Sequence, residues 1–135
     1  MKVILHVEDD PSLQNLVRIA LSRLAGYEVD TAGDGILAQE LARQRTPDLI
    51  LLDLDLPGMN GVETLHALRV IEALAAVPVI FLTASADPQT HASLLRLGAR
   101  FVLQKPFRPR ELAEIIRRTL SGDAAGAAPG EGGGA

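Results

Sequence analysis

A short apolar segment that ends in two acids and a turn constrains this chain more than any other feature. Residues 49–52 are all Leu or Ile, and Asp53, Asp55 and the turn pair Pro57-Gly58 follow them. A short apolar segment without polar alternation, bounded by a turn, is typical of a strand buried on both faces of a parallel sheet. Ligands of such sheets bind at the carboxyl ends of strands, which makes Asp53 a candidate functional residue.

Four more strand-like segments alternate with helical patterns along the chain, and one of them, residues 27–31, is more polar, as expected for a strand at the edge of a sheet. Strands are also predicted for residues 3–7, 27–31, 77–82 and 101–103. Helices are predicted to begin at Pro11, near Asp34, after Asn60, at Pro88 and at Pro109. This order predicts an α/β fold, a doubly wound five-stranded parallel sheet with five helices and right-handed crossovers. The flavodoxin-like strand order 2-1-3-4-5 is typical of such a sheet.

Apolar residues at helical spacing predict the buried faces of the helices. The predicted stripes are Leu13, Leu16, Val17, Ala20, Leu21 and Leu24 in the first helix, Leu37 and Leu41 in the second, Val62, Leu65 and Leu68 in the third, and Leu112, Ile115, Ile116 and Leu120 in the last. The fourth helix carries Leu94, Leu95 and Leu97, more than one face requires. These three leucines either pack inside or form part of an interaction surface.

The length of the chain and the composition of its last residues predict a single domain followed by a tail. Residues 1–120 contain every predicted strand and helix, which is enough chain for a hydrophobic core. Residues 121–135 are Gly, Ala, Ser, Pro and two acids, and a segment of this composition cannot offset the entropy of ordering itself. We therefore expect a domain over residues 1–120 and a disordered tail over residues 121–135.

The composition argues against several classes of protein. The net charge is −4, whereas a protein that binds nucleic acid needs a basic face. The absence of cysteine excludes disulfides, thiolate zinc sites and thiol catalysis. No signal peptide is visible, and Pro78 interrupts the longest apolar window, residues 73–86, which is too short to span a membrane. We expect a cytoplasmic protein that binds neither nucleic acid nor membrane.

The predicted topology brings polar residues from several strand ends to one rim of the sheet. The first and third strands are neighbours, so Glu8 and Asp9 should lie close to Asp53. Like charges this close raise one another's pKa, and oxygen ligands of this kind suit a hard cation such as Mg²⁺. Thr83 and Lys105 follow strands at the same rim. A carboxylate nucleophile, a metal, an ammonium and a hydroxyl are the groups that phosphoryl transfer to an aspartate requires.

Four segments in this order and spacing resemble the response regulator receiver domain (CheY-like) family. They are ILHVEDDP, LILLDLDLPGMNG, FLTA and KPF, and the resemblance extends from about residue 2 to residue 120. It implies that Asp53 accepts a phosphoryl group and that Thr83 and Lys105 contact its oxygens. It also implies that Glu8, Asp9, Asp53 and the backbone carbonyl of Asp55 hold Mg²⁺, for which Mn²⁺ could substitute.

The resemblance further implies a cis peptide bond at Lys105-Pro106 and a role of Asp55 and Ser85 in tuning self-dephosphorylation. The expected function is that of a stand-alone receiver of a two-component phosphorelay, a phosphoacceptor switch rather than an enzyme. The implied partners are a histidine kinase or histidine phosphotransfer protein, and a downstream protein that binds the face formed by the fourth helix, fifth strand and fifth helix. We expect a monomer or a weak homodimer.

The sequence departs from the family at one position. Members usually carry Tyr or Phe three residues before the lysine, where this chain has Val102 with Phe101 beside it. Neighbouring strand residues face opposite sides of a sheet. Either the aromatic residue of the switch is absent, or a bulge lets Phe101 take its place.

Two other functions share parts of this pattern. Asp53-Leu54-Asp55 resembles the nucleophile motif of haloacid-dehalogenase-like phosphatases, although Pro57 stands where those enzymes usually have Thr or Val. A flavin-binding module of the same fold would need a loop rich in Gly, Ser or Thr after the first strand, and this loop is acidic. The three histidines lack the spacing of a metal site, so we expect His6 to be hydrogen-bonded locally, and His66 and His91 to lie at the surface.

Overall fold

Five parallel strands form the centre of the structure, a computed structural model that describes residues 1–122. They are β1 (Val3–Val7), β2 (Glu28–Ala32), β3 (Leu49–Asp53), β4 (Val79–Thr83) and β5 (Phe101–Gln104). Their order in the sheet is β2-β1-β3-β4-β5, with β2 at an edge. The predicted fold class and strand order are confirmed.

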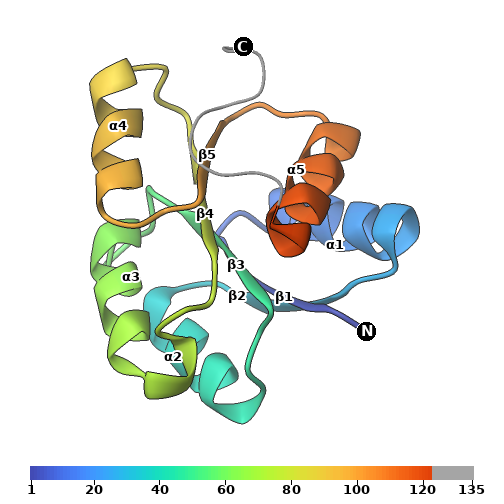
Figure 1. Ribbon diagram of the computed structural model, residues 1–135, viewed down its shortest axis with the longest axis horizontal. Coiled ribbons are helices and arrows are strands. Elements are labelled where there is room, and N and C mark those ends of the chain that lie inside the picture. The colour runs from blue at the N-terminus through green and yellow to red at the C-terminus, as the bar shows by residue number, and fades with distance from the viewer. Residues whose placement is uncertain (123–135) are drawn as a thin grey trace.

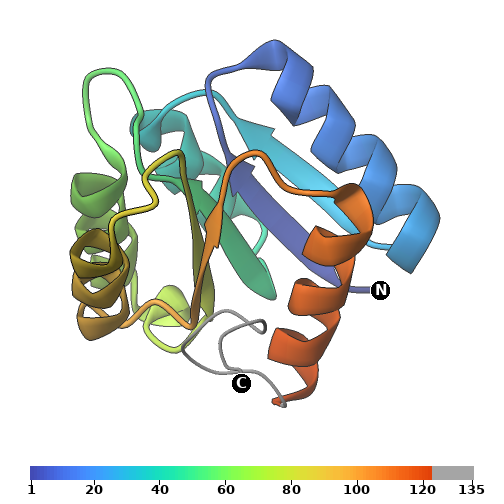
Figure 2. The ribbon, with the colours of Figure 1, turned by 90° about the horizontal axis from the view of Figure 1, so that it is seen from above.

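Helices cover both faces of this sheet. One layer consists of α1 (Pro11–Ala25) and α5 (Pro109–Ser121), and the other of α2 (Gly35–Gln44), α3 (Gly61–Val70) and α4 (Pro88–Arg96). Figures 1 and 2 show the two layers on opposite sides of the strands. A 3-10 helix, η1 (Glu72–Leu74), follows α3. Among the described residues, no helix is long and apolar enough to cross a membrane.

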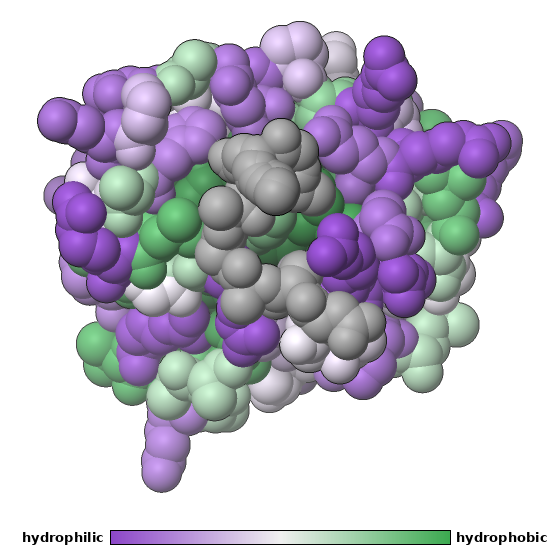
Figure 3. All heavy atoms as spheres, turned by 45° about the horizontal axis from the view of Figure 1, so that its top comes forward, coloured by the Kyte–Doolittle hydropathy of each residue, from purple (hydrophilic) through white to green (hydrophobic). Residues whose placement is uncertain are grey.

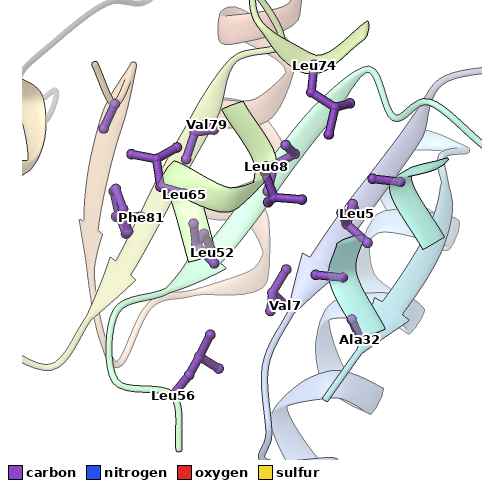
Figure 4. Packing of buried hydrophobic residues seen from close by; sticks show 14 of the residues in the cluster. Leu5, Val7, Ala32, Leu52, Leu56, Leu65, Leu68, Leu74, Val79 and Phe81 are labelled. Carbon is purple, nitrogen blue, oxygen red and sulfur yellow. The ribbon is translucent and has the colours of Figure 1, made fainter. Parts of the chain in front are cut away.

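The sheet divides the hydrophobic core in two. Leu5, Leu52 and Phe81 pack with α2, α3 and α4. Figure 4 shows these three residues in one cluster with Leu65 and Leu68 of α3. Ile4 and Leu51 point the other way, towards α1 and α5. Both faces of the central strands are therefore buried, which explains why their sequence is apolar at consecutive positions. On the face drawn in Figure 3, hydrophilic side chains predominate and apolar ones form small groups among them.

Side-chain caps set the beginning of four helices. Asp10, Asp34, Asn60 and Asp87 each accept a hydrogen bond from a backbone N–H in the first turn. Such a bond pairs one of the N–H groups that a helix leaves without an internal acceptor. The predicted cap role of Asp10 is confirmed by the bond from the N–H of Ser12 to its Oδ1, at 2.9 Å.

Three leucines that were predicted to be buried are exposed. Leu16 and Leu24 of α1 are 43% and 46% exposed, and Leu37 of α2 is 39% exposed. The buried residues of α2 are Gly35, Ala38 and Ala42. Their small side chains let this helix lie close to its neighbours. On α4, Leu94 is buried, Leu95 is partly buried and Leu97 is 42% exposed. The prediction erred in treating every leucine of a stripe as equally buried.

Two strands begin later than predicted because their first residues bond elsewhere. The N–H of Tyr27 donates to Leu21 at the end of α1, so β2 begins at Glu28. The N–H of Val77 closes the turn of η1 on Leu74, and β4 begins after Pro78, which has no N–H. At the other end, α5 includes Ser121, one residue beyond the expected end of the domain. The rest of the predicted tail, residues 123–135, lies outside the described residues.

Candidate functional site

Three carboxylates meet at the carboxyl ends of β1 and β3. The two strands pair in parallel with Val7 opposite Leu52, so the residues that follow emerge at the same rim. One carboxylate oxygen each of Glu8, Asp9 and Asp53 lies within 4.8 Å of the others. Glu8 and Asp53 are buried, whereas Asp9 is exposed. We call these three residues the acidic cluster.

Lys105 supplies a positive charge to the acidic cluster. Its Nζ donates to Oδ1 of Asp53 at 3.1 Å and to Oε1 of Glu8 at 3.2 Å. Its backbone N–H donates to the backbone oxygen of Thr83 at 2.7 Å, which fixes the lysine at the end of β5. The Lys105-Pro106 bond is cis, as the resemblance implied.

Burial and charge shift the protonation of these groups. Burial, and then the negative charge of Asp53, raise the pKa of Glu8 to about 7, although Lys105 opposes the shift. Burial lowers the pKa of Lys105, but its hydrogen bonds and charge interactions with Asp53 and Glu8 outweigh burial and raise that pKa above its ordinary value. One ammonium therefore faces three carboxylates, and the site carries an excess of negative charge.

The donors of the acidic cluster fit a hard divalent cation. They are carboxylate oxygens from three residues, and no thiolate is present in the chain. Mg²⁺ and Mn²⁺ prefer such oxygen ligands. A cleft of about 540 Å³, open to solvent, lies beside the cluster and is lined by Asp9, Leu54, Asp55, Leu56, Pro57, Asn60 and Val62.

The loop between β3 and α3 holds Asp53 from the other side. The backbone N–H of Asp55 donates to Oδ1 of Asp53 at 3.2 Å, and the Asp55 side chain itself is exposed. Gly61, the first residue of α3, lies directly against this loop. A Cβ at this position would meet the backbone oxygen of Asp53 at 2.5 Å and the Cα of Leu54 at 2.7 Å. A glycine is required here for the helix to begin so close to the end of β3.

Thr83 ends β4 at the same rim, and it is fully buried. Its Oγ1 accepts a hydrogen bond from the backbone N–H of Ser85 at 3.0 Å. Within the described residues this is the one hydrogen bond of the Thr83 side chain, so none joins it to Asp53 or to the ammonium of Lys105.

Phe101 does not take the place of the missing aromatic residue. Strand β5 pairs regularly with β4, with Phe101 opposite Ile80 and Val102 opposite Phe81. Phe101 packs with α1 and α5, whereas Val102 packs in the other half of the core. The bulge that would have brought Phe101 to the Val102 side is absent from this strand.

Two predictions about histidines were wrong. His6 was expected to be hydrogen-bonded locally, but it is fully buried and neither ring nitrogen has a hydrogen-bond partner among the described residues. Its Nε2 lies 4.0 Å from Oε1 of Glu8. Burial, and then the charges of Lys105 and Arg18, lower the pKa of His6 to about 3. The signal in the sequence was a single polar residue inside an apolar strand.

His91 was expected at the surface, but it is partly buried and bonds to the Ser85 backbone, whereas His66 is exposed as predicted.

Comparisons with known proteins agree with this geometry. The sequence matches the description "response regulator receiver domain" over residues 4–117. It is 43% identical over 117 residues to the DNA-binding response regulator MtrA of Mycolicibacterium smegmatis, an alignment that covers 87% of this chain and 50% of that protein. It is 39% identical over 126 residues to the phosphate regulon transcriptional regulatory protein PhoB of Pseudomonas aeruginosa, covering 90% and 55%. The chain thus spans about half the length of the curated relatives it matches.

Solved structures give the same result. The chemotaxis response regulator CheY4 of Vibrio cholerae superposes with a TM-score of 0.81 at 34% identity, covering 87% of this chain and 98% of that one. The receiver domain of the sensor histidine kinase PA1611 of Pseudomonas aeruginosa, solved with magnesium in its active-site cleft, has a TM-score of 0.79 at 36% identity, covering 89% and 98%. These matches favour neither the phosphatase nor the flavin alternative. The chain belongs to the response regulator receiver domain family, whose members are phosphoacceptor switches of two-component signalling.

Proposed function

We propose that Asp53 accepts a phosphoryl group from a phosphohistidine of a histidine kinase or histidine phosphotransfer protein. The observation that carries the proposal is the position of the Lys105 ammonium, 3.1 Å from Oδ1 of Asp53 and 3.2 Å from Oε1 of Glu8, the two buried residues of the acidic cluster. A carboxylate oxygen of Asp53 forms the new bond to phosphorus as the nitrogen–phosphorus bond of the donor breaks, and the donor imidazole leaves with a proton.

Each remaining residue has a role in this transfer. Lys105 holds one oxygen of Asp53 in place and offers its charge to the phosphoryl oxygens. Glu8, Asp9 and Asp53, with the backbone carbonyl of Asp55, would hold Mg²⁺. When bound, Mg²⁺ supplies positive charge that neutralises phosphoryl oxygens, and Mn²⁺ could substitute. Thr83 would donate its hydroxyl hydrogen to the phosphoryl group.

Labelling with a small phosphodonor tests the assignment of Asp53. Acetyl phosphate with Mg²⁺ should label the unmodified chain, and Asp53→Asn should abolish the label because the amide is not a nucleophile. Asp55→Asn is the matched control, an exposed acid two residues away that should still become labelled. Labelling of Asp53→Asn at the rate of the unmodified chain would overturn the proposal.

We also propose that Asp55 tunes the lifetime of the phosphoryl group. Its exposed carboxylate follows the residue that carries the phosphoryl group and lines the open cleft beside it, where water has access. The phosphorylated Asp55→Asn variant should therefore decay at a different rate from the unmodified chain. Identical decay of the two proteins, followed after removal of the phosphodonor, would remove this idea.

The output of the switch is proposed to be a contact with another protein on the face formed by α4, β5 and α5. Phosphorylation would shift a conformational equilibrium that already exists, and the partner would bind one of its states. The relative MtrA is a DNA-binding response regulator about twice as long as the matched region. We predict that the described domain signals through this protein contact and binds no nucleic acid, and specific retention of DNA at physiological salt would contradict that prediction.

A further inference from the structure

Three hydrogen bonds of Ser85 join strand β4 to helix α4, one of them from the backbone N–H of Asp87 to Oγ of Ser85 at 3.1 Å. The backbone N–H of Ser85 donates to Oγ1 of Thr83 at 3.0 Å. Its backbone oxygen lies 2.7 Å from Nε2 of His91, which is on α4. A carbonyl oxygen only accepts, so Nε2 of His91 carries a proton and donates it. A continuous series of hydrogen bonds therefore runs from the hydroxyl of Thr83 through Ser85 to the ring of His91.

The bond from His91 is not needed to begin α4. Asp87 already caps this helix, because its Oδ1 accepts from the backbone N–H of Gln89 at 3.0 Å and its Oδ2 accepts from the Thr90 hydroxyl at 3.3 Å. Pro88 supplies the first helical residue. What the His91 bond adds is a connection between the body of the helix and the loop formed by residues 84–87.

Strand β5 offers no equivalent connection. Val102 is buried, its side chain has no polar atom, and it belongs to the apolar core next to α3 and α4. Phe101 packs on the opposite face of the sheet, with α1 and α5. The Thr83 side chain makes its one hydrogen bond, within the described residues, to Ser85. From the Thr83 side chain the hydrogen bonds lead to Ser85, and from Ser85 to the N-cap of α4 at Asp87 and to the body of the helix at His91.

We propose that His91 is the positioning residue through which α4 responds to the state of Asp53, an inference that rests on the proposed function. The hydroxyl hydrogen of Thr83 has no acceptor among the described residues. Asp53 stands at the end of the neighbouring strand, in register with Leu82, so a phosphoryl group there brings acceptor oxygens to this rim. When the Thr83 hydroxyl turns towards them, its bond from Ser85 changes, and the Ser85 carbonyl moves α4 through His91.

Variants at position 91 separate this role from simple packing. His91→Phe keeps a ring of similar shape but removes the donor, whereas His91→Gln keeps an N–H donor on a side chain of similar length. His66→Phe makes the same chemical change on the exposed side of α3 and is the matched control. The probe is beryllofluoride with Mg²⁺, a stable stand-in for a phosphoryl group on aspartate, added to the full chain.

Backbone amide NMR reports the two ends of the series in one experiment. Amides of residues 53–55 report occupancy of the site, and those of residues 88–96 report the response of α4. All variants should bind beryllofluoride at residue 53 alike. In His91→Phe the equilibrium between the two α4 states should shift about fivefold less than in the unmodified chain, the factor for one hydrogen bond of about 1 kcal/mol. His91→Gln should restore the response, and His66→Phe should not change it.

The outcomes distinguish a failure of the role of His91 from a failure of the proposed function. A full α4 response in His91→Phe would overturn the role of His91 while leaving the proposed function intact. No response of residues 53–55 in the unmodified chain would overturn the proposed function and the inference with it. Ring ¹⁵N shifts of the unmodified chain give a test that depends on no variant. The Nε2 signal of His91 should move on addition of beryllofluoride and that of His66 should not, and an unmoved His91 signal would refute the coupling.

Discussion

The Nζ of Lys105 donates a hydrogen bond to Oε1 of Glu8 at 3.2 Å, although the two residues are 97 positions apart in the sequence. Glu8 is 1% exposed, so its carboxylate has little contact with water. Lys105 also bonds Asp53, and one ammonium therefore compensates two buried carboxylates. Breaking a buried ion pair by removing one partner costs more than the pair contributes, because the other charge is left uncompensated.

Lys105→Met should destabilise the fold most at high pH without Mg²⁺. At pH 8 the buried carboxylates of Glu8 and Asp53 lose their cation, and the pKa of Glu8 rises further because Lys105 no longer lowers it, at a cost of about 1–3 kcal/mol in the free energy of unfolding. Lowering the pH to 5 protonates Glu8, and adding Mg²⁺ restores positive charge, so either change should recover part of the loss. Urea unfolding followed by circular dichroism suits this chain, which has no Trp. An equal loss at both pH values, with or without Mg²⁺, would contradict the prediction.

The affinity of the site for Mg²⁺ should rise with pH up to about pH 7 and then level off. Burial and the charge of Asp53 raise the pKa of Glu8 to about 7, so below that pH a proton competes with the cation. Without Mg²⁺, and between the pKa that Glu8 has in the unfolded chain and pH 7, the native chain holds this proton whereas the unfolded chain does not. The free energy of unfolding therefore falls as the pH rises through that window. Calorimetric titration from pH 5.5 to 8.5 measures the affinity. In the control Glu8→Gln, affinity should be lower and this pH dependence should disappear.

Replacing His6 by leucine should stabilise the fold. The imidazole is fully buried with both nitrogens unpaired among the described residues, a cost of about 1–3 kcal/mol that an apolar side chain would avoid. Burial lowers the pKa of His6 to about 3, so the unfolded chain binds a proton that the native chain does not. The free energy of unfolding therefore falls as the pH drops from the pKa that His6 has in the unfolded chain towards 3. The stability gained by His6→Leu should grow over this range. Urea midpoints at pH 7 and pH 5 that were the same for both proteins would refute this.

Gly61→Ala should displace the loop that carries Asp53. The new Cβ would meet the backbone of Asp53 and Leu54 at 2.5 and 2.7 Å, and backbone atoms cannot move aside as a side chain does. We expect a loss of about 1–3 kcal/mol in unfolding free energy and slower labelling of Asp53. Gly33→Ala is the control, because a Cβ there would meet only the end of Gln14 at 3.9 Å. Equal stability and equal labelling of the two variants would show that the close approach at position 61 is unimportant.

The sequence predicted the strand order and the acidic cluster because both depend on local signals. The apolar segment before Asp53 indicated a strand buried on both faces, and the alternation of strands and helices indicated a sheet in which the first and third strands, and therefore Glu8, Asp9 and Asp53, are neighbours. Errors arose where two elements compete for one group. The N–H of Tyr27 could pair in β2 or close α1, and the folded chain uses it to close α1. No pattern within either segment records that choice.

Side-chain partners across the fold were beyond reach of the sequence. Among the described residues His6 has no hydrogen-bond partner and His91 has one, the backbone of Ser85, and no pattern of residues near either histidine predicts this difference. Regular pairing of β5 decided which face Phe101 occupies, since a shift of one residue would exchange it with Val102. Periodicity and turn residues act over a few positions, so the sequence by itself determined the elements, their order and the rim at which the acids gather. Only the tertiary structure decided which buried groups are paired, because such contacts join residues far apart in the chain whose distances are set by packing.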